Sequence, residues 1–340
     1  MIEALLYEKL ERDRVRCNVC QWRCIIMPGK RGACCTRENR QGTLYTLIYD
    51  QVSSANLDPI EKKPLYHFHP GTPVFSLGTL GCSFSCPGCQ NWQISQRTPL
   101  ETDPMLTRMT PAAAVETAMR AGAEGICWTY NEPAIWLEHT LEGARLAKEA
   151  GLYTAYVTNG TATREQLDLI GPYLDAYRVD IKAFSPDGYK AIAGFAKFEG
   201  ILENTHYARE HWGMHVECVT NVTPTINDSD EMLRGIARWI AAALGVDTPW
   251  HVTRFFPYQG FNHLPVTPLA RLDRAGEIGR EEGLRYIYVG NVPGDPRQDT
   301  HCPSCGHTVI RRHGFAVAHL ELTGGACPRC ATVIAGRWDG

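Results

Sequence analysis

The chain has 340 residues, 44% hydrophobic and 21% charged, which is the composition of a globular protein with enough apolar material for one large domain or a core with small appendages. Its formal net charge of −3 gives no broad basic surface, which disfavours nucleic acid and anionic lipid as partners. No apolar run approaches the length of about 18 residues that a membrane span needs. The charged start of the chain lacks the apolar core of a signal peptide, so we expect a cytoplasmic protein.

Cysteines are the most informative residues of this sequence. There are 14 of them, and in a cytoplasmic chain they indicate metal ligands rather than disulfides. Most fall into three clusters, from which we predict an N-terminal Cys-rich metal-binding module with a linker (1–70), a catalytic core (71–296) and a C-terminal zinc-ribbon module (297–340). Cys127 and Cys218 lie in apolar runs, which is typical of small buried side chains.

The first cluster has the spacing C-x2-C-x3-C-x9-C and consists of Cys17, Cys20, Cys24 and Cys34, with Cys35 as an alternative fourth ligand. Four thiolates suit a zinc ion and a [4Fe–4S] cluster equally well. The turn-rich stretch "PGKRG" before the fourth cysteine favours a small closed knuckle, and we predict zinc. The chain between this cluster and the next is long enough to bring the two close together, so an auxiliary iron–sulfur cluster is the open alternative.

The second cluster follows the apolar, strand-like run "TPVFSLGTLG" and has the spacing C-x3-C-x2-C, with Cys82, Cys86 and Cys89. A closed zinc site needs four ligands and a disulfide framework needs an even number, so neither is satisfied. Three thiolates can hold a [4Fe–4S] cluster and leave one iron open for another ligand. We predict such a reactive cluster; a three-ligand zinc site and incidental buried thiols are the alternatives.

From the second cluster onward the sequence alternates between strand and helix patterns. The helices are predicted at 110–122, 133–151, 164–174, 198–210, 230–245 and 267–283, and the strands at 72–81, 125–130, 152–160, 176–184, 214–224, 250–256 and 284–290. Repeated βα units predict an α/β fold with a parallel sheet, here a partial (β/α)6-type TIM barrel. Chemistry in such folds lies at the C-terminal ends of the strands, where the second cysteine cluster stands.

The predicted strand "YRVDIKAF" carries three alternating charges. Arg178, Asp180 and Lys182 share one of its faces because side chains alternate along a strand. In a strand covered by helices, that face points into the barrel, where charges are costly unless they are paired or bind a charged ligand. We therefore expect Asp180 and Lys182 to bind a charged ligand; a solvated ion pair is the alternative.

Two C-x2-C pairs near the end of the chain form a zinc-ribbon pattern, and we predict that they hold a structural zinc ion through Cys302, Cys305, Cys327 and Cys330. The short stretch "VIRRH" offers too little basic surface to favour nucleic-acid binding. We expect the neighbouring His301 and His307 not to be ligands. His67 and His69, in "HFHP", are expected to pack in the interior or lie at the surface rather than reach a substrate.

The C-x3-C-x2-C motif after the first strand of a (β/α) barrel resembles the radical S-adenosylmethionine (SAM) superfamily. The resemblance implies that Cys82, Cys86 and Cys89 ligate a [4Fe–4S] cluster whose open iron chelates the amino and carboxylate groups of SAM. An electron from the cluster then cleaves SAM to methionine and a 5′-deoxyadenosyl radical, which abstracts hydrogen from a substrate. An electron donor such as flavodoxin or ferredoxin is implied as a partner.

Further roles are carried over from the family to matching positions. Phe84 and Trp92 lie in the loop that shields the cluster and approaches the adenine of SAM. Glu132, in "TYNEP", matches the glutamate of a Gly-Gly-Glu-Pro turn that contacts the SAM amino group in related activating enzymes. Tyr130 and Asn131 stand where that turn has its two glycines, and the resemblance places Tyr130 with Glu132 among the SAM-binding residues.

The next strand ends add to the resemblance. Thr158 and Asn159, in "VTNG", match a Thr-Asn-Gly motif of the activases of glycyl radical enzymes, which have a cation-site aspartate where this chain has Val157. Asp180 and Lys182 resemble the SAM-contacting Asp-x-Lys motif of pyruvate formate-lyase activating enzyme. The zwitterionic methionine part of SAM suits this pair.

Nearly the whole chain is similar to the radical SAM enzymes of the AmmeMemoRadiSam system, through the N-terminal cysteines, "CQNWQISQ", "RFFP" and "YVGNVPGDPRQDTHCPSCG". These enzymes are described as homologues of pyruvate formate-lyase activating enzyme, and the similarity implies links to an Ammecr-type and a Memo-type protein. We predict a radical SAM oxidoreductase or activase-like enzyme that abstracts hydrogen from a peptide or protein partner. Radical modification of a small metabolite and a non-catalytic metal-ribbon interaction protein are the alternatives.

Overall fold

The computed structural model describes residues 1–99 and 106–338, which divide into two compact units. The first unit comprises Met1–Asp58, Pro73–Tyr177 and Glu199–Met214, and the second comprises Pro59–Thr72, Arg178–Phe198 and His215–Gly340. Each unit thus takes three separate stretches of chain. The division into consecutive modules at 1–70, 71–296 and 297–340, predicted from the cysteine clusters, stays a prediction.

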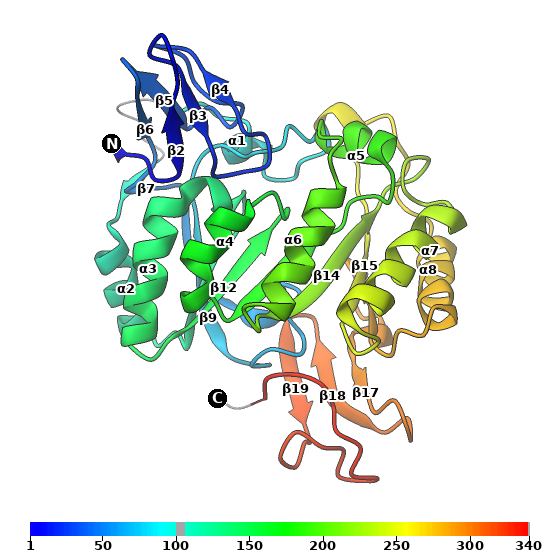
Figure 1. The fold of residues 1–340 in the computed structure, drawn as a ribbon. Coiled ribbons are helices and arrows are strands. Elements are labelled where there is room, and N and C mark those ends of the chain that lie inside the picture. Colours follow the sequence, from blue (N-terminus) through cyan, green and yellow to red (C-terminus); the bar gives the residue numbers. More distant parts are fainter. Residues whose placement is uncertain (100–105, 339–340) are drawn as a thin grey trace. The chain divides into compact units, whose positions relative to one another are not determined.

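The central sheet is mainly parallel and has the strand order β8-β9-β11-β12-β13-β14-β15-β16. Figure 1 labels β9 and β12 of the first unit and β14 and β15 of the second. In the first unit, β11 (Gly125–Trp128) pairs in parallel with β9 (Pro73–Gly78) and with β12 (Tyr153–Thr158). In the second unit, β15 (Trp250–Arg254) pairs in parallel with β14 (His215–Val222) and β16 (Ile287–Gly290). The remaining two strands of the order are β8 (Ser54–Pro59) and β13 (Ala176–Asp180). The predicted α/β class with a parallel sheet is confirmed, while its closure into a partial barrel stays a prediction.

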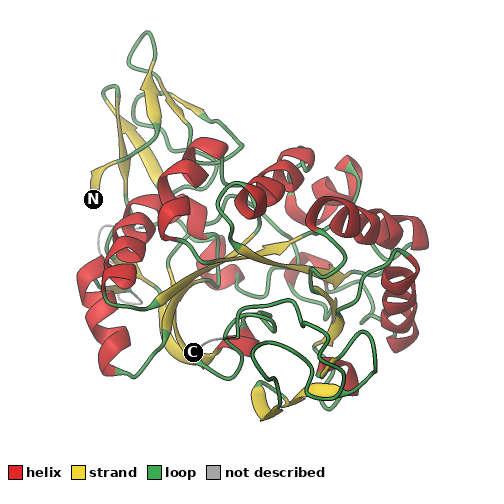
Figure 2. Ribbon diagram, turned by 60° about the horizontal axis from the view of Figure 1, so that its bottom comes forward, coloured by secondary structure: helices red, strands yellow, loops and turns green. Residues whose placement is uncertain are grey.

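The helices predicted between the strands are present close to their expected bounds. They are α2 (Pro111–Arg120), α3 (Leu137–Glu149), α4 (Arg164–Ile170) and α6 (Glu199–Glu210) in the first unit, and α7 (Asp230–Trp239) and α8 (Leu269–Glu281) in the second. In each unit the helices cover one face of the strands (Figure 2). The structure adds two short helices that were not predicted, α1 (Trp92–Ser95) and α5 (Pro186–Ala193).

Local signals explain where these helices begin and end. The hydroxyl of Thr110 accepts a hydrogen bond from the N–H of Ala113 (3.2 Å) and so caps α2, whose first residue is a proline. Ser185 caps α5 in the same way, and Gly194 ends that helix in the left-handed conformation. The predicted helix at 133–151 begins instead as a 3-10 turn at Pro133–Trp136, directly before α3.

Short antiparallel sheets flank the parallel strands in sequence. At the N-terminus they are formed by β1 (Ile2–Glu3), β2 (Tyr7–Lys9), β3 (Val15–Cys17), β4 (Ile25–Ile26), β5 (Arg37–Arg40) and β6 (Thr43–Thr46), in the orders β1-β6-β5 and β2-β3-β4. β7 (Gln51–Val52) pairs with β10 (Thr107–Arg108). Near the C-terminus β17 (Thr300–His301), β18 (Thr308–His313) and β19 (Ala316–Leu320) form a three-stranded sheet.

The parallel strands have apolar sequences because they lie in the core. All four residues of β11 are buried, because strands of a parallel sheet covered by helices have little contact with water. Trp128, Trp136 and Trp250 are among the largest fully buried side chains. Cys127 and Cys218 are fully buried as well, which confirms the prediction made for them. Within the described part of the chain, no helix combines the length and apolar character needed to cross a membrane.

Candidate functional site

The C-x3-C-x2-C cluster lies in the loop between β9 and α1. Cys82, Cys86 and Cys89 are all partly exposed. The N–H of Cys89 and the side chain of Gln96 both donate to the carbonyl of Cys86, at 3.2 and 2.8 Å. The Cys89 sulfur lies 3.1 Å from the hydroxyl oxygen of Ser95. Three partly exposed thiols after a parallel strand are suitable ligands for an iron–sulfur cluster with one open iron.

Hydrogen-bond donors surround the first of these thiols. The Nδ2 of Asn159 lies 3.7 Å from the Cys82 sulfur and donates to the Ser83 hydroxyl at 2.9 Å. The N–H of Phe84 lies 3.4 Å from the same sulfur. Burial, and next the carboxylate of Glu132, raises the pKa of Cys82 well above its usual value. A bound metal together with these donors would therefore be needed to keep this cysteine as a thiolate.

Glu132 joins the ends of two neighbouring strands. Its side chain is buried, and one carboxylate oxygen accepts from the N–H of Ala134 (2.9 Å) and the hydroxyl of Thr158 (2.7 Å). The other oxygen accepts from the N–H of Asn159 at 2.7 Å. These three bonds fix the loop after β11 against the end of β12. They give Glu132 a positioning role, and its expected contact with the SAM amino group stays a prediction.

Tyr130 and Asn131, which replace the two glycines of the family turn, both make hydrogen bonds with their side chains. Tyr130 has a positive φ of 72° and donates its hydroxyl hydrogen to Asp58 at 2.9 Å. Asn131 accepts from the N–H of Thr79 (3.2 Å) and donates to the carbonyl of Gly81 (2.7 Å). Asn131 therefore holds the segment that leads from β9 to the first cysteine. Sequence reasoning missed this role, for which a polar side chain directly after a strand was the available signal.

The other predicted cofactor residues of the first unit lie near the cysteines in sequence or at the end of β12. Phe84 is buried and Trp92, at the start of α1, is 39% exposed. Thr158 and Asn159 are buried within the Glu132 network. Contacts of these side chains with SAM stay predictions.

In the second unit, the three alternating charges at the end of β13 lie together. The Asp180 carboxylate pairs with the Arg178 guanidinium and, at 2.9 Å, with the Lys182 ammonium. Burial by itself raises the pKa of Asp180, but the two cations outweigh it and lower that pKa below its usual value. Val179 and Ile181, on the alternate positions, are fully buried. The group is an ionised carboxylate between two cations, with Asp180 and Lys182 still partly exposed.

Comparison with known proteins decides the family. The sequence profile described as the radical SAM superfamily matches residues 77–240. An uncharacterized protein of Methanocaldococcus jannaschii is 40% identical over 336 residues, covering 98% of this chain and 99% of that relative. The chain therefore contains a radical SAM superfamily domain.

Two more distant similarities agree with this assignment. The pyruvate formate-lyase-activating enzyme of Clostridium pasteurianum is 26% identical over 191 residues, covering 54% of this chain and 77% of that enzyme. A radical SAM methyltransferase structure from Sphaerobacter thermophilus has a TM-score of 0.50 and 18% identity, covering 65% of this chain and 67% of that one, which shows a shared fold. Family membership implies a [4Fe–4S] cluster and SAM as cofactors. The partly exposed triplet with its donors fits such a cluster.

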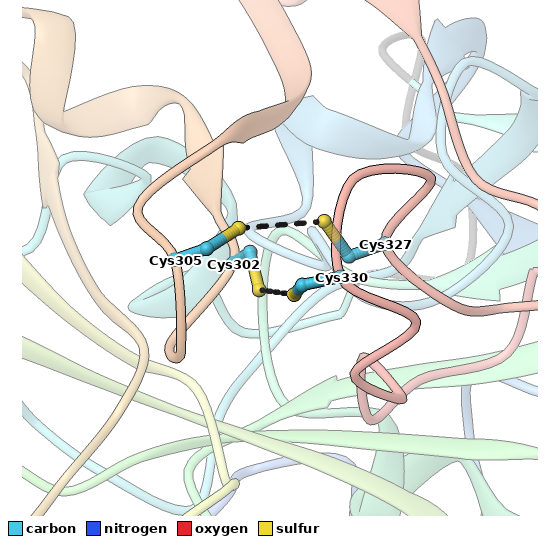
Figure 3. A group of neighbouring side chains, drawn as sticks. All are labelled: Cys302, Cys305, Cys327 and Cys330. Atoms are coloured by element: carbon cyan, nitrogen blue, oxygen red, sulfur yellow. Dashed lines mark hydrogen bonds between the residues drawn. The ribbon is translucent and has the colours of Figure 1, made fainter.

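Outside the radical SAM triplet, the structure gathers four C-terminal cysteines of the second unit (Figure 3). The sulfurs of Cys302 and Cys330 are 3.5 Å apart, those of Cys305 and Cys327 are 3.7 Å apart, and all four lie within 4.8 Å of one another. A tetrahedral zinc site with Zn–S bonds of about 2.3 Å places sulfurs roughly 3.8 Å apart. The set therefore fits a single metal ion. Among the described residues no other group of His, Cys, Asp and Glu ligand atoms is assembled for one ion, and His301 and His307 do not belong to this one.

The N-terminal cysteines meet around a recess of the first unit. Its lining includes Cys17, Cys20, Cys24 and Cys34, and Cys35 does not belong to it. Burial raises the pKa of Cys17 to about 11, partly offset by the guanidinium of Arg37. The structure thus selects Cys34 as the fourth ligand candidate.

His67 is a packed interior residue, as expected. Its ring nitrogens lie 2.5 Å from the carbonyl oxygen of Ala335 and 2.5 Å from the hydroxyl of Tyr288. Its backbone N–H donates to the carboxylate of Glu217 at 2.8 Å. Burial lowers the pKa of His67 to about 3, so the ring is neutral at physiological pH.

Proposed function

We propose that this protein is an activase-like radical SAM enzyme that abstracts hydrogen from a peptide or protein partner. The observation that carries the proposal is the partly exposed triplet of Cys82, Cys86 and Cys89 at the end of a parallel strand, held by Asn131 and Asn159. The similarity to the activating enzyme of Clostridium pasteurianum, whose name states that it acts on another enzyme, supports a protein as the substrate.

Each residue of the site would contribute in a definite way. When bound, the [4Fe–4S] cluster and SAM would supply a 5′-deoxyadenosyl radical that can abstract a hydrogen atom. The three cysteines would hold the cluster and leave one iron open. We propose that Lys182 binds the carboxylate of the methionine part of SAM and that Asp180 binds its amino group, because both charges remain partly exposed. Phe84 and Trp92 would shield the site from water.

The proposal also includes partners and a second metal. A low-potential electron donor protein such as flavodoxin or ferredoxin would reduce the cluster, and the resemblance to the AmmeMemoRadiSam enzymes supports links to an Ammecr-type and a Memo-type protein. We propose structural zinc for the four C-terminal cysteines, since their spacing suits one tetrahedral ion. Co-purification of tagged protein from its source under anaerobic conditions, followed by identification of the bound chains, tests the partners.

Cleavage of SAM tests the core of the proposal. The anaerobically reconstituted and dithionite-reduced protein should convert SAM to 5′-deoxyadenosine and methionine, and Cys86→Ser should abolish this conversion. Lys182→Ala should weaken SAM binding and leave the absorption spectrum of the cluster intact, because it removes a carboxylate partner and no iron ligand. The exposed Lys190 of α5 provides a matched control, since Lys190→Ala removes a lysine outside the site. Full SAM cleavage by Cys86→Ser would refute the cluster assignment.

The substrate class requires a separate experiment. Source cells are grown in deuterated medium, and their lysate is separated into a protein fraction and a small-molecule fraction. Deuterium should enter 5′-deoxyadenosine when the reduced enzyme is incubated with unlabelled SAM and the protein fraction. Transfer from the small-molecule fraction alone would contradict a protein substrate.

A further inference from the structure

We propose that the N-terminal cysteines hold a second [4Fe–4S] cluster instead of the zinc ion that their sequence pattern favours. Its ligands are Cys17, Cys20, Cys24 and Cys34, and it lies against the loop that carries the radical SAM triplet. The inference does not depend on the substrate proposed above. It follows from the spacing of the four thiols, the surroundings of the recess that they line, and the contacts of that recess with the triplet loop.

The spacing of the four thiols is too wide for one ion. All four cysteines line a recess with a volume of about 10 Å³. In a zinc site each sulfur lies about 2.3 Å from the ion, so the sulfurs are roughly 3.8 Å apart, whereas the four N-terminal sulfurs are not gathered within 4.8 Å of one another. In a [4Fe–4S] cluster, each thiolate binds a different iron at a corner of a cube, which keeps the four sulfurs further apart.

The other cysteine groups of this chain serve as internal standards. The C-terminal four are drawn together as for a single ion, with all sulfurs within 4.8 Å of one another. The radical SAM triplet, which the family uses for a [4Fe–4S] cluster, is not drawn together in this way in the described structure, and neither are the four N-terminal cysteines. By this comparison the N-terminal group matches the cluster-binding group of the same chain.

The surroundings of the recess suit a buried anionic cluster. Val19, Ile26 and Ile135 supply an apolar lining that excludes water. The Arg37 guanidinium also lines the recess, is 1% exposed, and has an Nε–H that is buried without a hydrogen-bond acceptor. An unsatisfied donor of this kind is costly, and the sulfurs of a cluster are acceptors for it. The N–H of Ala33 already donates to the Cys24 sulfur at 3.5 Å.

Contacts within the first unit place this recess beside the triplet loop. The indole N–H of Trp22, between two of the N-terminal cysteines, donates to the carbonyl of Ser83 at 2.6 Å. On the other side of Cys82 in the sequence, a Cβ atom added at Gly81 would lie 2.7 Å from the carbonyl oxygen of Cys34. Gly81 and Ser83 flank Cys82 in the sequence. The loops that carry the two groups of cysteines are therefore in direct contact on both sides of Cys82.

Metal content tests the proposal without any catalytic assay. Protein purified without exposure to air should contain about eight irons and one zinc per chain, with Mössbauer spectra of [4Fe–4S] clusters. The triple variant Cys82→Ser/Cys86→Ser/Cys89→Ser should keep about four irons and about four acid-labile sulfides. Adding Cys20→Ser and Cys24→Ser should remove that iron, whereas adding Cys35→Ser, outside the recess, should leave it unchanged.

The opposite result is equally definite. About four irons and two zincs in the wild-type chain, with no iron in the triple variant, would overturn the second cluster. If the triple variant does not fold, the wild-type count decides alone. Loss of SAM cleavage with about eight irons present would contradict the proposed function and leave the second cluster standing.

Electron paramagnetic resonance tests the position of the second cluster. When both clusters are reduced, their spins should couple, and the spectrum should simplify to that of one cluster in Cys20→Ser/Cys24→Ser. Two reduced clusters with independent, uncoupled spectra would contradict their placement on loops that are in direct contact.

Discussion

Asn159 connects the polar network at the strand ends with Cys82, the first of the predicted cluster ligands. Its amide lies 3.7 Å from the Cys82 sulfur, and its backbone N–H is held by the Glu132 carboxylate. Hydrogen bonds to cluster sulfurs help set reduction potentials, because they stabilise the more negative reduced state. The polar network at this site therefore bears on how easily the cluster is reduced.

Removing this amide should make the cluster harder to reduce. Asn159→Ala should retain the cluster but lower its potential by about 40 mV, the equivalent of one hydrogen bond of about 1 kcal/mol in a one-electron couple. A redox titration followed by electron paramagnetic resonance measures the shift. Asn204→Ala is the matched control, because Asn204 is a buried amide that donates to the Ala162 carbonyl. Equal shifts in both variants would show that the amide of Asn159 has no specific effect on the cluster.

His67 and Glu217 give the second unit a defined response to acid. The Glu217 carboxylate accepts from the rings of His215 (2.9 Å) and His251 (2.6 Å), and these bonds outweigh burial and lower the pKa of Glu217. The pKa of His67 is about 3, below its ordinary value, because its ring is buried. The folded state therefore binds fewer protons than the unfolded state, and stability falls as the pH falls.

The pH range of this response follows from the pKa of His67 in the folded protein and its ordinary value in the unfolded chain. The contribution of His67 is fully present above about pH 6.5 and is lost as the pH falls toward the folded pKa of about 3. Within this window, His67→Asn should reduce the slope of unfolding free energy against pH by about 1.4 kcal/mol per pH unit, the effect of one proton. Chemical denaturation at several pH values measures it. An unchanged slope would show that the ring is not neutral and buried in solution.

At the scale of elements, local signals were enough for the helices and the long strands. Thr110-Pro111 before α2 and the apolar runs of β9, β11 and β12 act within a few residues, so the sequence alone located them. The N-terminal strands are too short to show alternation, and β1 pairs with β6 more than forty residues away. Helix α5 was missed although Ser185 and Gly194 mark both of its ends.

The same distinction applies to the candidate site. Spacing alone predicted the radical SAM triplet, and alternation alone predicted that Arg178, Asp180 and Lys182 lie together, as they do. The structural roles of Asn131 and Glu132 depend on loops that meet only in the fold. The spread of the N-terminal thiols likewise depends on how their loops pack, and spacing could not separate zinc from a cluster.

The C-terminal sheet is expected to depend on the zinc ion that we propose for its four cysteines. Cys327→Ser should remove about one zinc per chain and destabilise the sheet of β17, β18 and β19, because the binding free energy of a structural zinc is also folding free energy. Zinc analysis and thermal melting measure both effects, and SAM cleavage per folded molecule should persist. His307→Ala is the control, since His307 lies outside the four-sulfur group. A folded Cys327→Ser protein that keeps its zinc would contradict the assignment.

At the scale of the whole chain, residues 1–58 belong to the same compact unit as the strands β9, β11 and β12. Arg37 of β5 and Glu138 of α3 form a buried bidentate ion pair, with bonds of 2.9 and 2.7 Å and side chains 1% and 3% exposed. Separating such a pair leaves an uncompensated buried charge. This ion pair thus joins residues that are 101 positions apart, and no local sequence pattern predicts it.

Gly81 tests whether the N-terminal segment and the triplet loop must fit together for either metal site to form. Its φ is +78°, and an added Cβ would lie 2.7 Å from the Cys34 carbonyl oxygen. Gly122 has a similar φ of +72° with nothing within 4 Å of its added Cβ, so Gly122→Ala isolates the backbone strain, about 1 kcal/mol. Gly81→Ala should lower the melting temperature more than this control and reduce the iron content. Equal melting temperatures and an unchanged iron content in both variants would show that the metal sites do not require the close fit of the two loops.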